Sequence, residues 1–342
     1  FLRAGYDINQ RLIPYTSDST HGRAAFVGIL NTLLVAFVGC FFATILGLFV
    51  GILRLSKNWL VAKLMSIYIE GFRNVPVLLW IVMIFALLTE FTPAPKAFKG
   101  ADPQATMFLF DSIAVTNRGT YFPAPIFGEG SFWLLISFIL SVLIVIFIKQ
   151  YANKQKKETG KSLPTFWISI LIIILPTLGL YFLIGKPISL EYPYLKGFNF
   201  KDGIHLRNSF LALTLALALY TSAFIAEIVR AGILAISKGQ TEAAASLGLR
   251  PNKIMNLIIL PQALRIIVPP LISNYLNLTK NSSLAIAVGY MDVRGTLGGI
   301  TLNQTGRELE SMLLLMGFYL CVSLLISSVI NYYNRSFQIV VR

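Results

Sequence analysis

Long apolar stretches separated by short polar ones run along most of this chain. At a rise of about 1.5 Å per helical residue, seven of these stretches are long enough to cross the roughly 30 Å hydrocarbon core of a bilayer. The predicted spans cover residues 26–53, 64–88, 132–148, 166–184 and 206–236, a segment that follows Pro261, and residues 312–332. The pattern therefore predicts an all-α polytopic membrane protein with about seven visible spans.

The polar stretches divide the chain into four parts. We expect an exposed N-terminal segment at 1–25, a first part of the membrane core at 26–90, an insert at 91–205 and a second part of the core at 206–342. Two of the predicted spans belong to the insert. Because the sequence begins with Phe1 and not with Met, we expect that it lacks an initial segment of the protein.

Basic residues predict the orientation of the spans. The 342 residues are 56% hydrophobic and 13% charged, and the formal net charge is +14. In membrane chains, Lys and Arg are enriched in short cytoplasmic loops. If the chain starts outside and crosses the membrane seven times, the C-terminus lies in the cytoplasm, together with the basic clusters at 54–63, 149–161 and 230–265. The outer loops are then residues 91–130, 185–206 and 289–310. We therefore interpret the basicity as membrane topology, with a lipid bilayer and not nucleic acid as the partner.

Several classes of chemistry lack a recognisable motif. The cysteines lie inside apolar runs and the histidines lie far apart, which argues against a disulfide framework and against a metal site. These residues are Cys40, Cys321, His21 and His205. The sequence Gly160-Lys161-Ser162 ends like a phosphate-binding loop, but Gln155 stands where that motif requires its first glycine. The chain is therefore not expected to be an enzyme, to hold a metal or cofactor, or to bind ATP itself.

Four polar or helix-breaking residues interrupt the first half of the second predicted span: Glu70, Arg73, Asn74 and Pro76. Proline has no backbone N–H, so Pro76 should kink or break the helix. Ionisable groups at membrane depth usually face a cavity or a partner, which makes Glu70, Arg73 and Asn74 candidates for a translocation path. The alternative, with equal weight, is an ion pair between Glu70 and Arg73 near the membrane interface.

The fifth predicted span ends with a second pair of opposite charges. Glu227 and Arg230 are three residues apart and lie on one helix face. Glu227 is a candidate residue of the translocation path, in a gate formed with Arg230. The alternative that we favour is a helix end at the lipid headgroups.

A stripe of amide side chains lies inside the sixth predicted span. Asn274, Asn277 and Asn281 are spaced three and four residues apart and share one helix face, with Lys280 beside them. These groups could bind a carboxylate or line a wet path, because hydrocarbon offers them no hydrogen-bond partner. The alternative is that they join this helix to a neighbouring subunit.

The stretch between the fifth and sixth spans, residues 242–261, predicts a compact helix–turn–helix. Glu242 and the three alanines that follow it favour a helix, Gly248 interrupts that helix, and Pro251 can start a second one. A polar, basic segment of this shape could sit in a groove of a cytoplasmic partner and transmit the partner's movement to the spans.

The spacing within this segment resembles a signature of the permease subunits of bacterial ATP-binding-cassette (ABC) importers. It consists of Glu-Ala-Ala, three residues, Gly248, nine residues, Ile258, one residue and Leu260-Pro261. Three further stretches, which begin GILNTLLVAF, EGFRNVPVLL and YTSAFIAEIV, resemble the histidine and glutamine type of polar-amino-acid permease. The insert at 91–205 departs from that simpler pattern and resembles the larger permeases of the general L-amino-acid importers of Gram-negative bacteria.

The resemblance implies a type I ABC importer transmembrane fold in the bacterial inner membrane, with the helix–turn–helix as a coupling helix that docks on an ATPase. The coupling contacts would be Glu242, Ala243, Ala244, Gly248, Ile258, Leu260 and Pro261. The implied partners are a homologous permease in a heterodimer, two ATP-binding subunits that carry ATP and Mg²⁺, a periplasmic amino-acid-binding protein and an amino-acid substrate. Substrate would cross by alternating access.

An ion-coupled secondary amino-acid transporter is the alternative class of protein. It would also have many spans with polar breaks. Such transporters often contain an inverted repeat, and the two halves of this sequence show no convincing one.

Overall fold

The chain folds into two compact units, which we describe separately. The computed structural model describes residues 2–100, 103–159 and 164–337, without the side chains of Lys157 and of residues 330–337. The first unit comprises Phe1–Pro93, Thr116–Gly119 and Leu206–Arg342, and the second comprises Ala94–Val115 and Thr120–His205. The predicted cytoplasmic residues Lys161 and Arg342, and the Gly160-Lys161-Ser162 sequence, lie outside the described residues.

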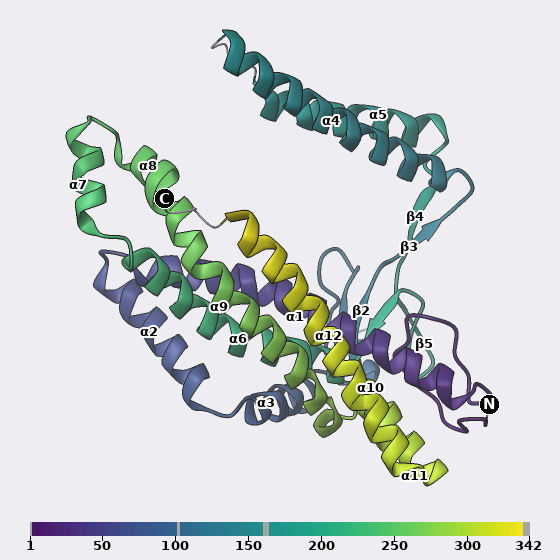
Figure 1. Cartoon of the computed structure of the whole chain (residues 1–342). Helices are drawn as coiled ribbons and strands as arrows, with labels where there is room; N and C mark the ends of the chain where they lie inside the picture. The colour runs from purple at the N-terminus through teal and green to yellow at the C-terminus, as the bar shows by residue number, and fades with distance from the viewer. Residues whose placement is uncertain (1, 101–102, 160–163, 338–342) are drawn as a thin grey trace. The chain divides into compact units, whose positions relative to one another are not determined.

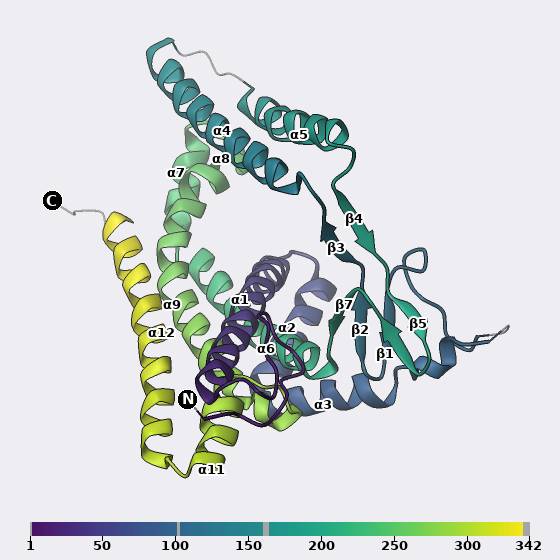
Figure 2. The ribbon, with the colours of Figure 1, turned by 90° about the vertical axis from the view of Figure 1, so that its right-hand side faces the viewer.

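In its described part, the first unit consists of long helices gathered around a central one. They are α1 (His21–Arg54), α2 (Trp59–Asn74), α3 (Val77–Glu90), α6 (Asn208–Leu234), α9 (Leu260–Asn281) and α12 (Glu308–Phe337). The central helix is α6, which packs against α1, α2, α3 and α9 (Figures 1 and 2). Within its most apolar 18-residue window, 67% of the residues are buried, a larger share than in any other candidate span.

Glycines bring α1 and α6 close together. A Cβ atom added at Gly47 of α1 would lie 2.6 Å from the Cβ of Ile225 in α6. One added at Gly51 would lie 2.7 Å from the carbonyl oxygen of Ala226. Because no side chain fits at these separations, the glycines set the distance between the two helices, as small residues do in membrane helix pairs.

The described helices agree with the predicted number of spans. Six helices are long and apolar enough to cross a membrane, and α2 and α3 together form a seventh candidate that is bent by 105°. α2 ends at Asn74 and α3 begins at Val77. The structure thus confirms the predicted break at Pro76, where the helix loses a backbone donor.

Short helices lie at the two opposite ends of the first unit (Figures 1 and 2). One end holds α7 (Lys238–Ser246), α8 (Pro251–Ile254) and the π-helical turn Met255–Ile259, which continues into α9. The other end holds the 3₁₀-helix Ser282–Val288, α10 (Val293–Gly295), the π-helical turn Thr296–Thr301 and α11 (Leu302–Thr305).

The stretch 289–310, expected to be an outer loop, therefore contains helical turns. Asp292 caps α10, because its Oδ1 accepts a hydrogen bond from the Gly295 N–H at 2.8 Å. α1 also holds this stretch in place: Asn31 donates to the Met291 carbonyl at 2.8 Å, and Thr32 accepts from the Val293 N–H at 3.0 Å. The helical turns depend on these long-range bonds, which the sequence pattern does not show.

The N-terminal segment is only partly exposed. Most of its side chains are accessible, as expected, but Ala4, Ile8 and Tyr15 are buried against Ala24 and Val27 of α1. The segment therefore adds a small hydrophobic cluster to the end of the first unit that carries α10.

The second unit combines a helical hairpin with short strands. α4 (Ser131–Thr159) and α5 (Thr165–Leu183) pack against each other and correspond to the two predicted spans of the insert. The other described elements are η1 (Pro95–Phe98), β1 (Ala114–Thr116), β2 (Gly119–Phe122), β3 (Ala124–Phe127), β4 (Ile188–Glu191), β5 (Tyr194–Lys196), β6 (Asn199–Lys201) and β7 (Ile204–Leu206). The strands form a sheet in the order β1-β2-β7 and two antiparallel ribbons, β3–β4 and β5–β6.

The stretches 91–130 and 185–206, expected to be outer loops, thus contain short strands. Tyr121 and Phe200 pack with Ala114 in a small core, and the ring of Tyr121 stacks on that of His205 with 4.2 Å between centroids. Strands of three or four residues are too short to produce a clear alternation of polar and apolar positions, which is why the sequence pattern does not reveal them.

Candidate functional site

Residues 242–261, called the coupling segment here after the role that the resemblance implies, fold as the predicted helix–turn–helix. α7 ends at Ser246, Gly248 adopts a left-handed conformation with φ of +77°, and Pro251 occupies the first turn of α8. A side chain at Gly248 would meet no atom within 4 Å. The turn therefore needs glycine for its backbone conformation, and the space beside it is open.

The predicted coupling residues differ in their exposure. Glu242 and Ala243 are exposed on α7, whereas Ala244 is only 3% exposed. Leu247, which the sequence analysis does not single out, is 81% exposed. The accessible surface of the segment thus combines a carboxylate, small side chains and one large apolar side chain. Of the remaining predicted contacts, Ile258 is half-buried, and Leu260 and Pro261 are exposed.

The coupling segment is joined to the membrane core by one continuous helix. α8, the π-helical turn and α9 follow one another without a break, and the resulting helical segment extends over Pro251–Val288. Gln262 fixes α7 to this helix, because its Nε2 donates to the Gln240 side chain and to the Ile258 carbonyl. The sequence analysis does not identify this link, since it joins residues 22 positions apart.

A polar cavity of about 270 Å³ lies farther along the same helix. It is lined by Tyr220, Thr221 and Phe224 of α6 and by Asn274, Asn277, Lys280 and Asn281 of α9. The predicted stripe therefore shares one face and lines a cavity. Its amides, ammonium and hydroxyls can donate to a carboxylate, and the amide oxygens can accept from an ammonium group.

Glu227 lies one turn beyond this cavity and joins two helices. It accepts a hydrogen bond from Arg230 at 2.6 Å on its own helix and forms an ion pair with Arg54 at the end of α1. The Glu227 and Arg54 side chains are 25% and 19% exposed. The pair of Glu227 with Arg230 is thus part of a three-residue cluster that ties α1 to α6.

The candidates on α2 lie apart from the lining of the cavity. Glu70 and Asn74 are exposed. The Arg73 guanidinium lies over the Phe224 ring, 5.2 Å from its centroid, and so touches a residue that lines the cavity. Among the ion pairs of the described residues, none joins Glu70 to Arg73.

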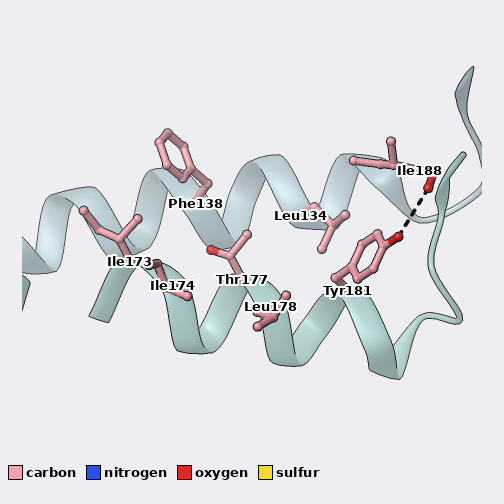
Figure 3. Close-up of a pocket in the computed structure, with 8 residues that line it drawn as sticks. All are labelled: Leu134, Phe138, Ile173, Ile174, Thr177, Leu178, Tyr181 and Ile188. Atoms are coloured by element: carbon pink, nitrogen blue, oxygen red, sulfur yellow. Dashed lines mark hydrogen bonds between the residues drawn. The ribbon is translucent and has the colours of Figure 1, made fainter. Parts of the chain in front are cut away.

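The second unit has a groove of a different character. The groove between α4 and α5 has a volume of about 430 Å³ and is lined mainly by leucine, isoleucine and phenylalanine side chains (Figure 3). Thr177 and Tyr181 are its polar residues, and the Tyr181 hydroxyl donates to the Ile188 carbonyl at 3.4 Å. An apolar groove of this kind suits hydrocarbon and offers little to a zwitterionic ligand.

Comparisons with known proteins identify relatives over the whole chain. Residues 158–338 match the family described as binding-protein-dependent transport system inner membrane component. The glutamate/glutamine/aspartate/asparagine transport system permease protein BztB of Rhodobacter capsulatus is 54% identical over 99% of this chain and 84% of its own length. The general L-amino acid transport system permease protein AapQ of Rhizobium johnstonii is 44% identical over 99% of this chain and 83% of its own length.

A solved structure has the same fold. In the crystal structure of an amino acid ABC transporter with histidines, one chain superposes with a TM-score of 0.53 at 19% sequence identity, covering 92% of this chain and 95% of that chain. The predicted ABC importer fold is confirmed by this similarity.

Proposed function

Because this chain belongs to the family of inner-membrane components of binding-protein-dependent transport systems, we propose that it is the membrane-spanning permease of an amino-acid importer, driven by ATP hydrolysis on separate subunits. The names of the relatives support an amino-acid substrate. The polar cavity between α6 and α9 supports it as well, because its groups match both charges of a zwitterion.

One observation carries the proposal: the helix that begins in the coupling segment also lines the polar cavity. From Pro251 to Asn274 this helix extends about 35 Å at 1.5 Å per residue. A continuous helix transmits a displacement of one end to the other, so a partner that moves α7 and α8 would move the cavity-lining residues of α9 against α6.

In the proposed mechanism, ATP-binding subunits carry the nucleotide and its Mg²⁺ and dock on α7 and the turn at Gly248. Their closure moves the coupling segment, and the cavity opens toward the outside, where it receives the amino acid. Hydrolysis resets the cavity toward the cytoplasm. The ligands shift this equilibrium only through their different affinities for the two states.

The remaining partners follow from the same proposal. A homologous permease completes the path as a heterodimer, and a periplasmic binding protein delivers the amino acid. The basic residues that flank the spans support a cytoplasmic coupling segment and C-terminus, and in this proposal the end with α10 and α11 faces outward. The alternative, an ion-coupled secondary transporter, receives no support from the relatives.

The test is a substitution in the coupling turn. Aspartate tolerates a positive φ better than most residues, so Gly248→Asp should leave the fold intact and place a carboxylate in the docking surface. We expect membrane insertion to be unchanged and substrate-stimulated ATP hydrolysis by the purified complex to be lost.

The matched control is Gly306→Asp, at the opposite end of the unit. Gly306 has a φ of +64° and no atom within 4 Å of an added Cβ, as at Gly248. A cysteine at the exposed Ser246 should in addition form a cross-link to an ATPase subunit. Full hydrolysis in Gly248→Asp, or cross-links only to lipid or to this same chain, would refute the docking claim.

A further inference from the structure

The apolar groove between α4 and α5 lies within two candidate membrane spans and is open to its surroundings (Figure 3). It extends from the middle of α5, at Ile173, to the β3–β4 ribbon, where Ile188 completes its lining. Three of the lining side chains, Phe138, Ile174 and Leu178, are exposed. A hydrocarbon chain of the surrounding bilayer can therefore reach the groove.

The composition of the two helices explains the opening. Toward the end of the hairpin away from the ribbon, small side chains are buried and allow a close approach: Ser141 and Ala152 of α4 and Ser169 of α5. In α5, Pro176 has no N–H to donate and favours a bend within the part of the helix that lines the groove. Close contact at one end and a bend at Pro176 leave space between the helices near the ribbon.

The size of the groove favours a single chain over a helix as its occupant. From Ile173 to Tyr181 the groove follows α5 for about 12 Å. A piece of helix of this length, with a diameter of about 10 Å, occupies roughly 900 Å³, whereas the groove has a volume of about 430 Å³. A helix of a neighbouring subunit would rest on the rim, and an extended acyl chain would fit inside.

The apolar lining does not by itself select one lipid, because lipid tails are as apolar as leucine. A preference has to come from polar groups at the mouth of the groove. Trp133 is exposed and directly precedes the lining residue Leu134. Because tryptophan is enriched at the level of the lipid headgroups, the mouth of the groove lies at that level.

Two opposite charges flank this mouth. Glu129 precedes α4, Lys186 follows α5, and the Gly128 N–H joins the two segments by donating to the Pro187 carbonyl at 2.8 Å. Both charged side chains are exposed, and neither belongs to an ion pair of the described residues. The Lys186 ammonium lies 5.8 Å from the centroid of the Phe182 ring, beside the last turn of α5. A headgroup that carries both a phosphate and an ammonium group would complement the two charges.

We propose that the groove binds one phospholipid with an ethanolamine headgroup. One acyl chain lies between α4 and α5, the phosphate lies at Lys186 and the ammonium group lies at Glu129. The lipid fills the space beside α5, in whose apolar window only 6% of the residues are buried. In the orientation of the proposed function this lipid belongs to the outer leaflet, but the site goes beyond that function and does not depend on it.

The test measures the lipids that bind to the full transport complex. The complex is purified in a mild detergent, stripped of lipid and titrated with palmitoyl-oleoyl phosphatidylethanolamine, and the bound lipids are counted by native mass spectrometry. We expect one lipid per copy of this chain to bind more tightly than the others. Leu178→Trp, which places an indole ring in the groove, should abolish this tight binding.

Matched variants separate the groove from the rest of the surface. Leu175 is 61% exposed on the same helix but outside the lining, so Leu175→Trp should keep the tight site. Lys186→Gln should weaken the binding by up to about fivefold, as expected for an exposed charge pair, whereas the exposed Lys196→Gln should not. Glu129→Gln should remove the preference for phosphatidylethanolamine over phosphatidylglycerol.

Loss of the tight lipid in Leu178→Trp together with its retention in Leu175→Trp supports the site. Absence of a tight lipid, or an equal effect of the two tryptophans, overturns it, because lipid then only coats the hairpin. Unchanged affinity and selectivity in both Lys186→Gln and Glu129→Gln also overturn it. The same holds if Leu178→Cys cross-links to another subunit in membranes, because a protein then covers the groove. If Leu178→Trp does not assemble, Phe138→Trp in the same lining replaces it.

Discussion

Asp292 is a carboxylate enclosed by the protein at the end of the first unit that carries α10 and α11. Its side chain is 0% exposed, and its Oδ2 atom has no hydrogen-bond partner among the described residues. Burial raises the pKa of the Asp292 carboxyl from 3.8 to about 6, although hydrogen bonds from the Gly295 and Arg294 N–H groups act in the opposite direction. The folded protein therefore favours the neutral form more than the unfolded chain does.

The raised pKa of Asp292 predicts a loss of stability as the pH rises. Between about pH 4 and pH 6 the folded protein binds more protons at this site than the unfolded chain, so the free energy of unfolding should fall by up to about 3 kcal/mol. Asp292→Asn keeps the oxygen that caps α10 and removes the charge. We expect its thermal unfolding to lose this pH dependence, while the exposed Asp7→Asn keeps it. Parallel pH profiles for wild type and Asp292→Asn would contradict the assignment.

The cluster of Glu227 with two arginines predicts a measurable coupling between α1 and α6. Glu227→Gln leaves Arg54 and Arg230 without their carboxylate in a partly buried site, which should cost roughly 1–3 kcal/mol. In a double-mutant cycle with Arg54→Gln, thermal unfolding of the purified complex should give a coupling free energy of about 1 kcal/mol or more.

An exposed ion pair serves as the control for this cycle. Arg3 and Asp18 are 3.5 Å apart, and their side chains are 78% and 79% exposed. Exposed pairs contribute little, so the cycle of Arg3→Gln with Asp18→Asn should give a coupling near zero. Equal couplings for the two pairs would show that Glu227 has no special part in joining the helices.

Single residues also show where the sequence is informative. The helical spacing of Asn274, Asn277 and Asn281 places them on one face without knowledge of the fold, because that face depends only on local geometry. By contrast, the pairing of Arg54 with Glu227 joins residues 173 positions apart. Such a contact depends on how two helices pack, which a single sequence does not specify.

At the scale of helices, the contact of α1 with α6 depends on the absence of side chains at Gly47 and Gly51. Gly47→Ala should raise helix propensity by nearly 1 kcal/mol and yet destabilise the protein, because the added Cβ would overlap Ile225. We expect a net loss of about 1–3 kcal/mol, the usual cost of overpacking, measured as a lower midpoint of thermal unfolding.

Gly71→Ala in α2 is the matched substitution. No atom lies within 4 Å of a Cβ built there, so this variant should be as stable as wild type or slightly more stable. A similar loss of stability in both variants would indicate that helix flexibility, and not the close contact, explains the effect at Gly47.

Helix boundaries follow local chemistry, and the sequence predicts them well. Pro76 ends α2, and Gly248 and Pro251 mark the turn between α7 and α8. The strands of the second unit are different, because their stability comes from partners distant in sequence, as in the pairing of Phe127 with Ile188. Strands of three or four residues are too short for such pairing to produce a recognisable pattern of polar and apolar positions.

At the scale of the molecule, the hairpin of α4 and α5 is joined to the strands by the β3–β4 ribbon. Phe127 pairs directly with Ile188, so the two strands can be closed by a two-residue turn. Replacing residues 128–187 with Asn-Gly, a sequence that favours such turns, should leave the first unit folded. We expect the shortened chain to insert, to assemble with its partners and to retain ATP hydrolysis.

A larger deletion provides the comparison. Replacing residues 94–205 with a flexible linker also removes the turn Thr116–Gly119, which belongs to the first unit. This variant should unfold at a lower temperature than the one that lacks only 128–187. If the smaller deletion already prevents assembly, the hairpin takes part in the complex.

The turn Thr116–Gly119 supplies a hydrogen-bond acceptor to α6, and this bond predicts when the insert arose relative to Asn208. Asn208, which is 4% exposed, donates to the carbonyl oxygens of Leu88 and Asn117. A forerunner without the inserted segment would have lacked the Asn117 oxygen, so an asparagine at position 208 would have had one acceptor fewer for its buried amide. In reconstructed ancestral sequences, Asn208 and the insert should therefore appear at the same branch of the family tree.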